Sequence, residues 1–263
     1  MDRDFLIVAP SYTHKSAGVR ALYRLCHHLN VAGYQAAMLP MLGQSIDDLP
    51  PWLTPLHAGA VGDSVVVYPE IVPGNPYEAR KVVRWALNIP GLLGGDRFYR
   101  DDEVVFVFNP TRLGVVSQAV RTPLGPDRVL FLGLVDPANI YPDDGVAKVI
   151  DCYFTGKGAA RRERWRLPDE ASYQRLEDIT PTMASLGDVL RRTGTLYSYD
   201  HASNVLKEAV ICGCRVVVVD ENGGLHDPQS CSCAYNIYWE PGFREGYARR
   251  YHDSSFVHDS CAC

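Results

Sequence analysis

Residues 196–217, LYSYDHASNVLKEAVICGCRVV, contain the pattern that decides the fold. The stretch 196–199 predicts a strand, and apolar residues then recur at helical spacing through 203–212. A Val-rich stretch at 216–219 predicts the next strand. Because a helix joins the two strands, we expect them to run parallel in one sheet.

The same alternation of strands and helices extends over the first half of the chain. The unbroken apolar stretch 5–9 is typical of a strand that is buried on both faces. Asn75, Pro76 and Glu78 form a helix-capping pattern, which predicts a helix at 75–87. The other elements predicted in this half are a helix from 16 to 33 and strands at 35–39, 64–68 and 103–108.

The second half repeats this arrangement after a connector rich in Gly and Pro, residues 109–127. Its predicted strands are 129–132, 146–154, 173–179, 196–199 and 216–219, and its predicted helices are 181–192 and 203–212. We therefore expect an α/β protein with two Rossmann-like domains on parallel sheets, residues 1–113 and 114–222. In the remaining tail, residues 223–263, the periodicity weakens.

The composition of the chain argues against two classes of protein, those that bind nucleic acid through a broad positive surface and those that span a membrane. The chain has 263 residues, a formal net charge of −5 and a pI near 5.9, so it lacks the broad positive field of a nucleic-acid-binding protein. It contains no apolar stretch of about 20 residues. Residues 1–4 lack a signal-peptide pattern, so we expect a cytoplasmic protein without disulfides.

The cysteines and the nearby histidines suggest a zinc site, but the cysteine spacing argues against it. The cysteines include three CxC pairs near His226, His252 and His258, whereas common zinc sites use CxxC. We therefore expect thiols and no bound metal. The pairs are Cys212 with Cys214, Cys231 with Cys233, and Cys261 with Cys263.

Polar residues that follow the predicted strands are the candidates for ligand binding, because ligands of open parallel sheets bind beyond the carboxyl ends of the strands. The loop 11–18 follows the first strand and contains His14, Ser16 and Gly18. Small residues before a helix leave amides that can bind phosphate or sugar oxygens. A plain strand–helix turn explains the loop equally well, since the GxGxxG pattern is absent.

Glu70 follows the third predicted strand. It is a candidate general base or acceptor contact, or it complements the dipole of the predicted helix 75–87. Arg80 and Arg84 share the polar face of that helix and either meet an anionic ligand or are solvated.

A basic loop follows the strand predicted at 146–154. Its sequence, Thr155-Gly156-Lys157-Gly158, sets a lysine between two glycines. Such a lysine can approach a diphosphate closely and offset the charge of a leaving nucleotide. The spacing is not that of a P-loop, and a solvated basic loop is the alternative.

The segment quoted first adds the remaining candidates. Its strand delivers Tyr199 and Asp200 to the carboxyl edge, and its helix presents Ser203 and Asn204 in the first turn, where amides and the helix dipole favour a phosphate. Glu208 lies farther along that helix. Two carboxylates beside such a site suit the hydroxyls of a sugar and a ribose.

This segment resembles the nucleotide-sugar motif of GT-B glycosyltransferases. In that motif an acidic residue, seven intervening residues and a glutamate followed by alanine precede a Gly-containing turn and a Val-rich strand. The resemblance implies that Asp200 contacts the transferred sugar and that Glu208 holds the nucleotide ribose. Retaining members usually have glutamate at the first position, so Asp200 is a departure from the family. Lys157 is similar to the family's basic residue that contacts the donor diphosphate.

Two segments of the first half also resemble this family. Residues 16–22 resemble the first loop and helix of the acceptor-side domain, and residues 68–76, YPEIVPGNP, resemble a segment of bacterial polysaccharide-type transferases. The resemblance implies a nucleotide-sugar donor and a glycan or lipid-linked acceptor, with no metal or other cofactor. It also implies no nucleic-acid partner, and it allows association with a membrane surface or a multi-enzyme assembly.

Two other functions remain open. A non-hydrolysing nucleotide-sugar 2-epimerase has the same architecture and needs no acceptor. A non-catalytic subunit that binds a nucleotide sugar or a glycan would explain the short chain and the aspartate at position 200. Incubation with the donor alone separates an epimerase, which changes the sugar, from a transferase.

Overall fold

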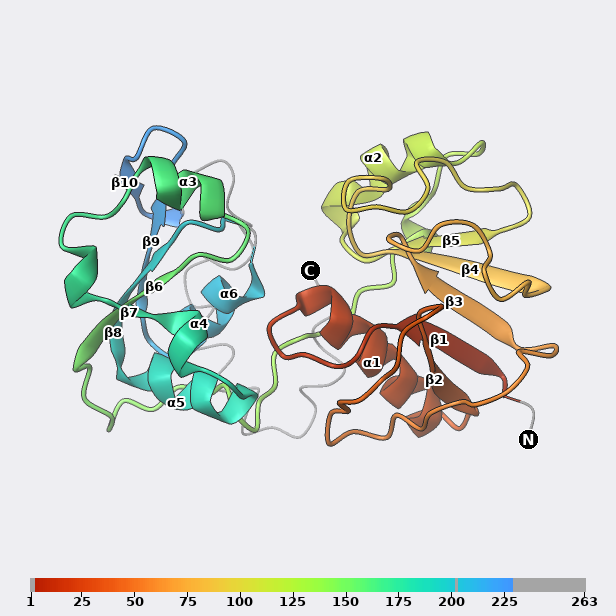
Figure 1. The fold of residues 1–263 in the computed structure, drawn as a ribbon, viewed down its shortest axis with the longest axis horizontal. Coiled ribbons are helices and arrows are strands. Elements are labelled where there is room, and N and C mark those ends of the chain that lie inside the picture. Colours follow the sequence, from red (N-terminus) through yellow and green to blue (C-terminus); the bar gives the residue numbers. More distant parts are fainter. Residues whose placement is uncertain (1–2, 202, 229–263) are drawn as a thin grey trace. The chain divides into compact units, whose positions relative to one another are not determined.

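The chain forms two compact units in the computed structural model, which describes residues 3–201 and 203–228 (Figure 1). The first unit extends to Leu134 and the second begins at Val135. The domain boundary expected after residue 113 therefore falls inside the first unit. Most of the predicted tail, from residue 229 onward, lies outside the described residues.

A five-stranded parallel sheet with the order β2-β1-β3-β4-β5 forms the centre of the first unit. The strands are β1 (Phe5–Ala9), β2 (Ala36–Pro40), β3 (Val65–Pro69), β4 (Lys81–Ala86) and β5 (Val104–Val107). Both faces of β1 are covered, and Leu6, Ile7 and Val8 are fully buried. This explains the unbroken apolar stretch in the sequence.

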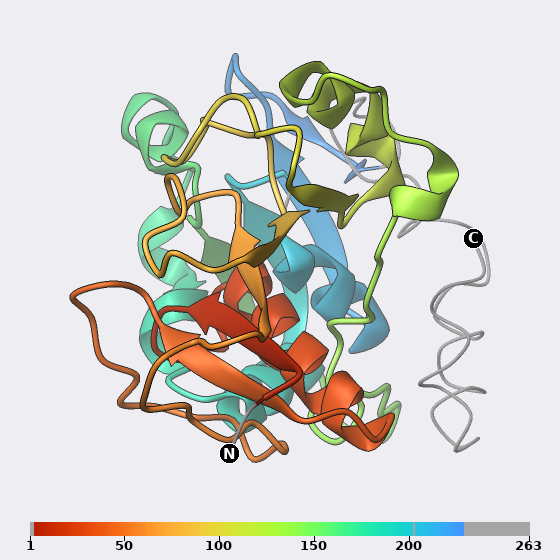
Figure 2. The ribbon, with the colours of Figure 1, turned by 90° about the vertical axis from the view of Figure 1, so that its right-hand side faces the viewer.

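Helix α1 (Ala17–Val31) covers one face of this sheet and lies along β1 and β2 (Figures 1 and 2). It begins at Ser16, whose Oγ accepts a hydrogen bond from the Val19 amide at 3.3 Å. Its buried side packs in one hydrophobic cluster that contains Leu22 and Trp85, and a second cluster covers the other face of the sheet. The sheet is thus apolar on both sides.

The helix predicted at 75–87 is wrong, because Lys81–Ala86 is the strand β4. The capping residue closes a turn instead: Asn75 Oδ1 accepts the Ala79 amide at 3.0 Å, and Asn75 Nδ2 donates to the Ala79 carbonyl at 2.8 Å. Glu78 has a left-handed backbone with φ of 51°, which a right-handed helix does not allow. The apolar positions of this stretch suit a strand between β3 and β5.

The segment 129–132, predicted as the first strand of the second half, packs on the first unit. Val129 forms an isolated parallel bridge with Val107, and the Leu130 amide donates to the Val107 carbonyl at 2.9 Å. Trp85 Nε1 donates to the Leu130 carbonyl at 3.1 Å, so the connector is anchored to the first sheet. Short helical turns precede it: η1 (Pro110–Arg112), α2 (Leu113–Val116), η2 (Ser117–Ala119) and η3 (Pro126–Arg128).

The second unit has its own five-stranded sheet, with the order β10-β9-β8-β6-β7. All pairs are parallel except β10 with β9. The strands are β6 (Ile150–Phe154), β7 (Gln174–Arg175), β8 (Thr193–Ser198), β9 (Arg215–Val219) and β10 (Leu225–His226). The expectation of an α/β protein with sheets that are parallel, or nearly so, is confirmed.

The second sheet is accompanied by helices of very different length. They are α3 (Ala159–Arg164), η4 (Glu170–Ser172), α4 (Leu176–Ile179), α5 (Met183–Arg192) and α6 (Asn204–Ile211). Helix α5 begins with a capping box between Thr182 and Ser185. Its Leu186 and Leu190 pack with Leu206 of α6 in the core of the unit.

The strand predicted at 173–179 is only partly right, because Gln174–Arg175 pairs with β6 and Leu176–Ile179 turns into a short helix. Leu176 is buried in the core, and Thr180 Oγ1 bonds back to the Leu176 carbonyl at 2.7 Å. The strand predicted at 146–154 is shorter than expected and begins at Ile150.

Both sheets contain a topological switch point, the position where the chain reverses the direction in which it adds strands. From β1 the chain moves to β2 on one side, whereas β3, β4 and β5 follow on the other side. In the second sheet, β7 lies on one side of β6, and β8 and β9 lie on the other. Ligands of such sheets bind beyond the carboxyl ends of the strands at this point. The candidate edges are therefore those of β1 with β3 and of β6 with β8.

Candidate functional site

The edge of β6 and β8 brings together two segments that are far apart in the sequence. The loop 155–158 follows β6, and Asp200 comes two residues after the end of β8 (Figure 1). The Lys157 amide donates a hydrogen bond to Asp200 Oδ2 at 3.0 Å. The side chain of Lys157 is exposed, whereas Asp200 is 8% exposed. The basic loop and the acidic residue thus form one local site.

Glycines allow the loop to pack this closely on the segment 198–200. A Cβ atom on Gly156 would lie 2.5 Å from Asp200 Oδ2, and Gly156 has a left-handed φ of 47°. A Cβ atom on Gly158 would collide with the carbonyl of Tyr199. The glycines that flank Lys157 are therefore required by the packing of the site.

A second carboxylate, that of Glu177, holds the same loop. Its Oε1 accepts the amides of Thr155 at 2.9 Å and Gly156 at 3.0 Å. Sequence reasoning missed this residue because it placed Glu177 within a strand, where its side chain would not reach the loop. The short helix α4 is what brings it there.

Helix α6 begins beside this edge. Ser203 is its N-cap, and Ser203 Oγ accepts the Val205 amide at 3.3 Å. Asn204 Nδ2 donates to Glu208 Oε1 at 2.8 Å. Ser203 and Asn204 are partly exposed, but Glu208 is 0% exposed. The first turn of α6 therefore faces outward at this edge while Glu208 lies inside.

Tyr199 does not lie on the surface of the site. Its side chain is fully buried, its hydroxyl donates to Glu170 Oε2 at 3.0 Å, and the hydroxyl oxygen accepts the Leu167 amide at 2.9 Å. Burial raises the pKa of Tyr199 to about 12. Its side chain therefore packs the interior, and only its backbone carbonyl lies next to Gly158.

Arg161 ties a third loop to the edge. Its guanidinium donates to the Tyr199 carbonyl and forms an ion pair with Glu221, which follows β9. Trp165 Nε1 donates to the Glu221 carbonyl at 3.0 Å. Side chains thus link the loops after β6, β8 and β9. These links hold the loops at the carboxyl edge of the sheet in a fixed arrangement.

The edge of β1 and β3 holds the candidates of the first unit. Ser16 caps α1, and His14 is partly buried in the preceding loop. A Cβ atom on Gly18 would make ordinary contact with Leu87 Cδ1 at 3.6 Å, so packing does not demand glycine there. Ser16 is the N-cap and Gly18 lies in the first turn of α1, where helix amides have no partner within the helix.

Glu70 follows β3 and is 3% exposed. Its Oε2 accepts the Leu87 amide at 3.0 Å, beyond the end of β4. Burial raises the pKa of the Glu70 carboxyl, while hydrogen bonds from its own backbone and from the backbones of Leu87 and Asn88, together with the charge of Arg112, oppose the rise. Glu70 is therefore a buried acid between the ends of two neighbouring strands.

The predicted site residues fall into two groups, each within one unit. The first unit contains His14, Ser16, Gly18 and Glu70, and the second contains Gly156, Lys157, Tyr199, Asp200, Ser203, Asn204 and Glu208. Direct hydrogen bonds join Lys157 to Asp200 and Asn204 to Glu208.

The absence of certain metal and membrane features applies to residues 3–201 and 203–228. This part of the chain contains no cluster of three or more His, Cys, Asp and Glu side chains that could hold a metal ion. None of its helices combines the length and the apolar character that a membrane span requires. Cys212 and Cys214 are buried thiols, and the other two CxC pairs lie outside the described residues.

No protein-family model matches the sequence, and no curated protein matches it significantly.

Proposed function

We propose that the protein is a cytoplasmic glycosyltransferase with two Rossmann-like domains of the GT-B type. It transfers a sugar from a nucleotide-sugar donor to a glycan or lipid-linked acceptor. The observation that carries the proposal is the 3.0 Å hydrogen bond between the Lys157 amide and Asp200 at the β6/β8 switch point. This bond joins the loop that carries the exposed Lys157 side chain to a carboxylate at one strand edge, and α/β sheets bind nucleotides at such edges.

In this proposal the donor diphosphate lies against Lys157 and the first turn of α6, at Ser203 and Asn204. The ammonium and the helix amides stabilise the charge that develops as the nucleotide leaves. Asp200 accepts hydroxyls of the sugar, since a carboxylate offers several acceptor positions. The reaction needs no bound metal and no other cofactor, because positioning and fixed charges supply the stabilisation.

We propose a different role for Glu208 from the one that the resemblance implies. The resemblance implies that Glu208 binds the ribose of the nucleotide, but Glu208 is fully buried and its Oε1 accepts a hydrogen bond from Asn204 Nδ2. We therefore place Asn204 at the nucleotide and assign Glu208 the task of holding the Asn204 side chain.

The acceptor belongs to the first unit in this proposal. The loop 11–18 and Glu70 lie at the carboxyl edge of its sheet, and a buried acid with a raised pKa suits the removal of a proton from an attacking hydroxyl. His14 is the other candidate for this step.

The first test is donor binding. Thermal-shift screening with UDP-, GDP-, dTDP-, CMP- and ADP-sugars should identify a donor that raises the melting temperature. Lys157→Met should then weaken the binding of that donor by about tenfold or more, because a hydrogen bond to a charged group contributes roughly 1.5–3 kcal/mol. Isothermal titration calorimetry measures both affinities.

The matched control is Lys81→Met, which removes an exposed lysine at the start of β4 in the first unit and should leave donor affinity unchanged. Absence of a shift with every sugar nucleotide, or wild-type affinity in Lys157→Met, would contradict the proposal. Conversion of the sugar in the absence of any acceptor would identify an epimerase instead.

A further inference from the structure

The chain between β3 and β4 makes a turn, residues 70–80, that side chains hold in place. Tyr68 donates its hydroxyl to Asn75 Oδ1 at 2.8 Å, and Asn75 binds both the amide and the carbonyl of Ala79. Tyr77 donates its hydroxyl to the Pro40 carbonyl at 2.5 Å. The turn thus has a fixed shape without a helix.

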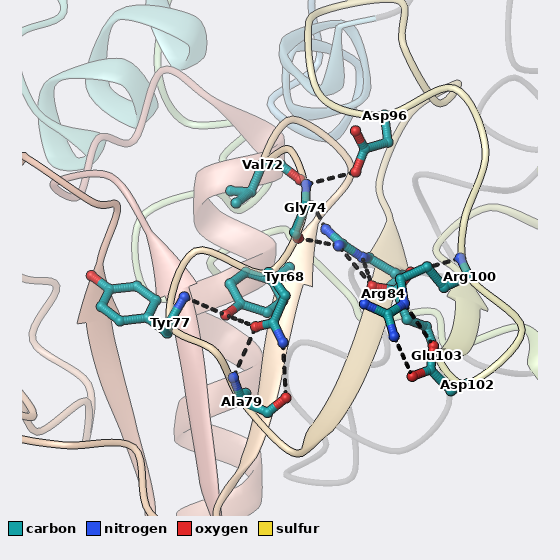
Figure 3. Close-up of polar contacts among 11 residues, drawn as sticks. Tyr68, Val72, Gly74, Tyr77, Ala79, Arg84, Asp96, Arg100, Asp102 and Glu103 are labelled. Carbon is teal, nitrogen blue, oxygen red and sulfur yellow. Dashed lines mark hydrogen bonds and ion pairs between the residues drawn. The ribbon is translucent and has the colours of Figure 1, made fainter.

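Arg84 forms a second set of contacts, with the carbonyls of Val72 and Gly74 and with the carboxylate of Glu103 (Figure 3). The sequence suggested a helix face for this residue, but it is on β4 and is 1% exposed. Its Nη1 donates to the Val72 carbonyl at 2.8 Å, and its Nη2 donates to the Gly74 carbonyl. One guanidinium therefore binds two carbonyls of the turn that begins at Glu70.

Glu103 balances the charge of Arg84 inside the protein. Its Oε1 accepts Arg84 Nη2 at 2.8 Å and Arg84 Nε at 3.2 Å, and the side chain of Glu103 is 4% exposed. The guanidinium also packs over the rings of Tyr68 and Tyr99, at 5.0 Å and 5.6 Å from the ring centroids. Arg84 is therefore enclosed by a carboxylate and two aromatic rings.

The segment 95–96 holds the turn from another side. Asp96 Oδ2 accepts the Gly74 amide at 2.6 Å, as Figure 3 shows. The backbone of Gly95 lies against the Glu70 carbonyl so closely that a Cβ atom there would collide with it. Both ends of the segment 70–74 are thus fixed.

Stability alone does not explain an ion pair in this position. Removing two charges from water is costly, and apolar residues of similar volume are often at least as stable in place of a buried pair. An apolar pair cannot, however, donate hydrogen bonds to the carbonyls of Val72 and Gly74. The backbone of the turn is itself unfavourable at Glu78, which has a φ of 51°.

We propose that Arg84 is a positioning residue, which fixes the turn 70–79 so that the Glu70 carboxyl stands at the end of β3. The role of Glu70 toward an acceptor hydroxyl rests on the proposed function, whereas the positioning itself does not. Arg84 fixes the turn through its hydrogen bonds to the Val72 and Gly74 carbonyls, and Glu103 orients the guanidinium by accepting hydrogen bonds from its Nε and Nη2.

Four variants separate positioning from stability. Arg84→Met removes the donors and leaves the Glu103 carboxylate buried without its countercharge, so it should destabilise the fold. Arg84→Met with Glu103→Leu replaces the pair by apolar side chains and should recover part of the unfolding midpoint that Arg84→Met loses, because no buried charge remains. Arg84→Lys keeps the positive charge but removes the planar guanidinium group, whose nitrogens reach Val72, Gly74 and Glu103 at the same time. Arg80→Met, which breaks the exposed pair with Asp63, is the control.

The decisive readout is amide hydrogen exchange of residues 71–79 in the double variant. If Arg84 positions the turn, this exchange rises by about tenfold more than the exchange of the β1 amides, which follows global stability, because the hydrogen bonds to the turn are lost. The NMR titration of the Glu70 carboxyl should move toward its ordinary value as water reaches it. Arg80→Met should change neither measurement.

Wild-type exchange at 71–79 and a wild-type Glu70 titration in the double variant would overturn the proposal. For the transfer reaction, the double variant should raise the acceptor KM and leave donor affinity unchanged, since Lys157 and Asp200 belong to the other unit. If the unmodified protein binds no sugar nucleotide, the proposed function fails, and hydrogen exchange still decides the role of Arg84.

Discussion

Glu70 shows how a single residue can oppose the stability of its own fold. Its carboxyl is 3% exposed, and burial raises its pKa despite the hydrogen bond from the Leu87 amide. An acid whose pKa is higher in the folded state than in the unfolded state destabilises the protein at pH values above both pKa values. This loss of stability disappears as the pH falls below the pKa of the acid in the unfolded state.

Glu70→Gln should therefore raise the free energy of unfolding at pH 7, and the difference from the wild type should vanish as the pH approaches 4. The Gln side chain keeps an oxygen that can accept the Leu87 amide and removes the charge. Denaturation curves at several pH values measure the effect. Glu78→Gln removes an exposed carboxyl from the same turn and serves as the control. A loss of stability at pH 7 in Glu70→Gln would contradict the prediction.

The sequence predicts the positions of some residues of the site and not of others. Lys157 and Asp200 each follow a strand end, and strand ends at a switch point meet, so their proximity can be reasoned from the pattern. Glu177 reaches the same loop only because α4 replaces part of an expected strand. The inward position of Glu208 depends on which side of α6 packs on the core, and the motif alone does not fix this.

At the scale of elements, the loop 155–158 depends on its glycines. Gly158→Ala should lower the free energy of unfolding by about 1–3 kcal/mol, because the added methyl group has to displace the Tyr199 carbonyl. Gly114→Ala is the control, since a Cβ atom there has no neighbour within 4 Å and the residue lies in α2. Alanine at 114 should be neutral or slightly stabilising. Chemical denaturation compares the two, and equal stabilities would argue against the close packing.

The elements differ in how far local pattern determines them. The strand β1 and the helices α1, α5 and α6 have apolar periodicity and caps that agree with their packing, so their existence was predictable. The strand β4 was not, because a capping pattern at 75–78 and apolar residues at helical spacing describe a helix equally well. The segment forms a strand because it pairs with β3 and β5, and local sequence patterns do not reveal this pairing.

At the scale of the whole molecule, each unit has its own sheet and its own hydrophobic clusters. Under the proposed function, the nucleoside diphosphate of the donor should therefore protect the amides of residues 155–158 and 199–208 from hydrogen exchange and leave the exchange of residues 70–79 unchanged. Mass spectrometry of the peptic peptides measures this protection. Protection confined to the first unit would place the nucleotide at the wrong edge and contradict the proposal.

The two sheets place their switch points in the same way, between the first strand of the sheet and the third, although their connections differ in length and in helical content. Under the proposed function, substitutions near Lys157 should therefore alter the preference for the donor and leave the backbone around Glu70 unchanged, because the two residues belong to different units. Exchange of the donor would then need changes only within residues 155–208, and natural variation would be able to alter one specificity at a time.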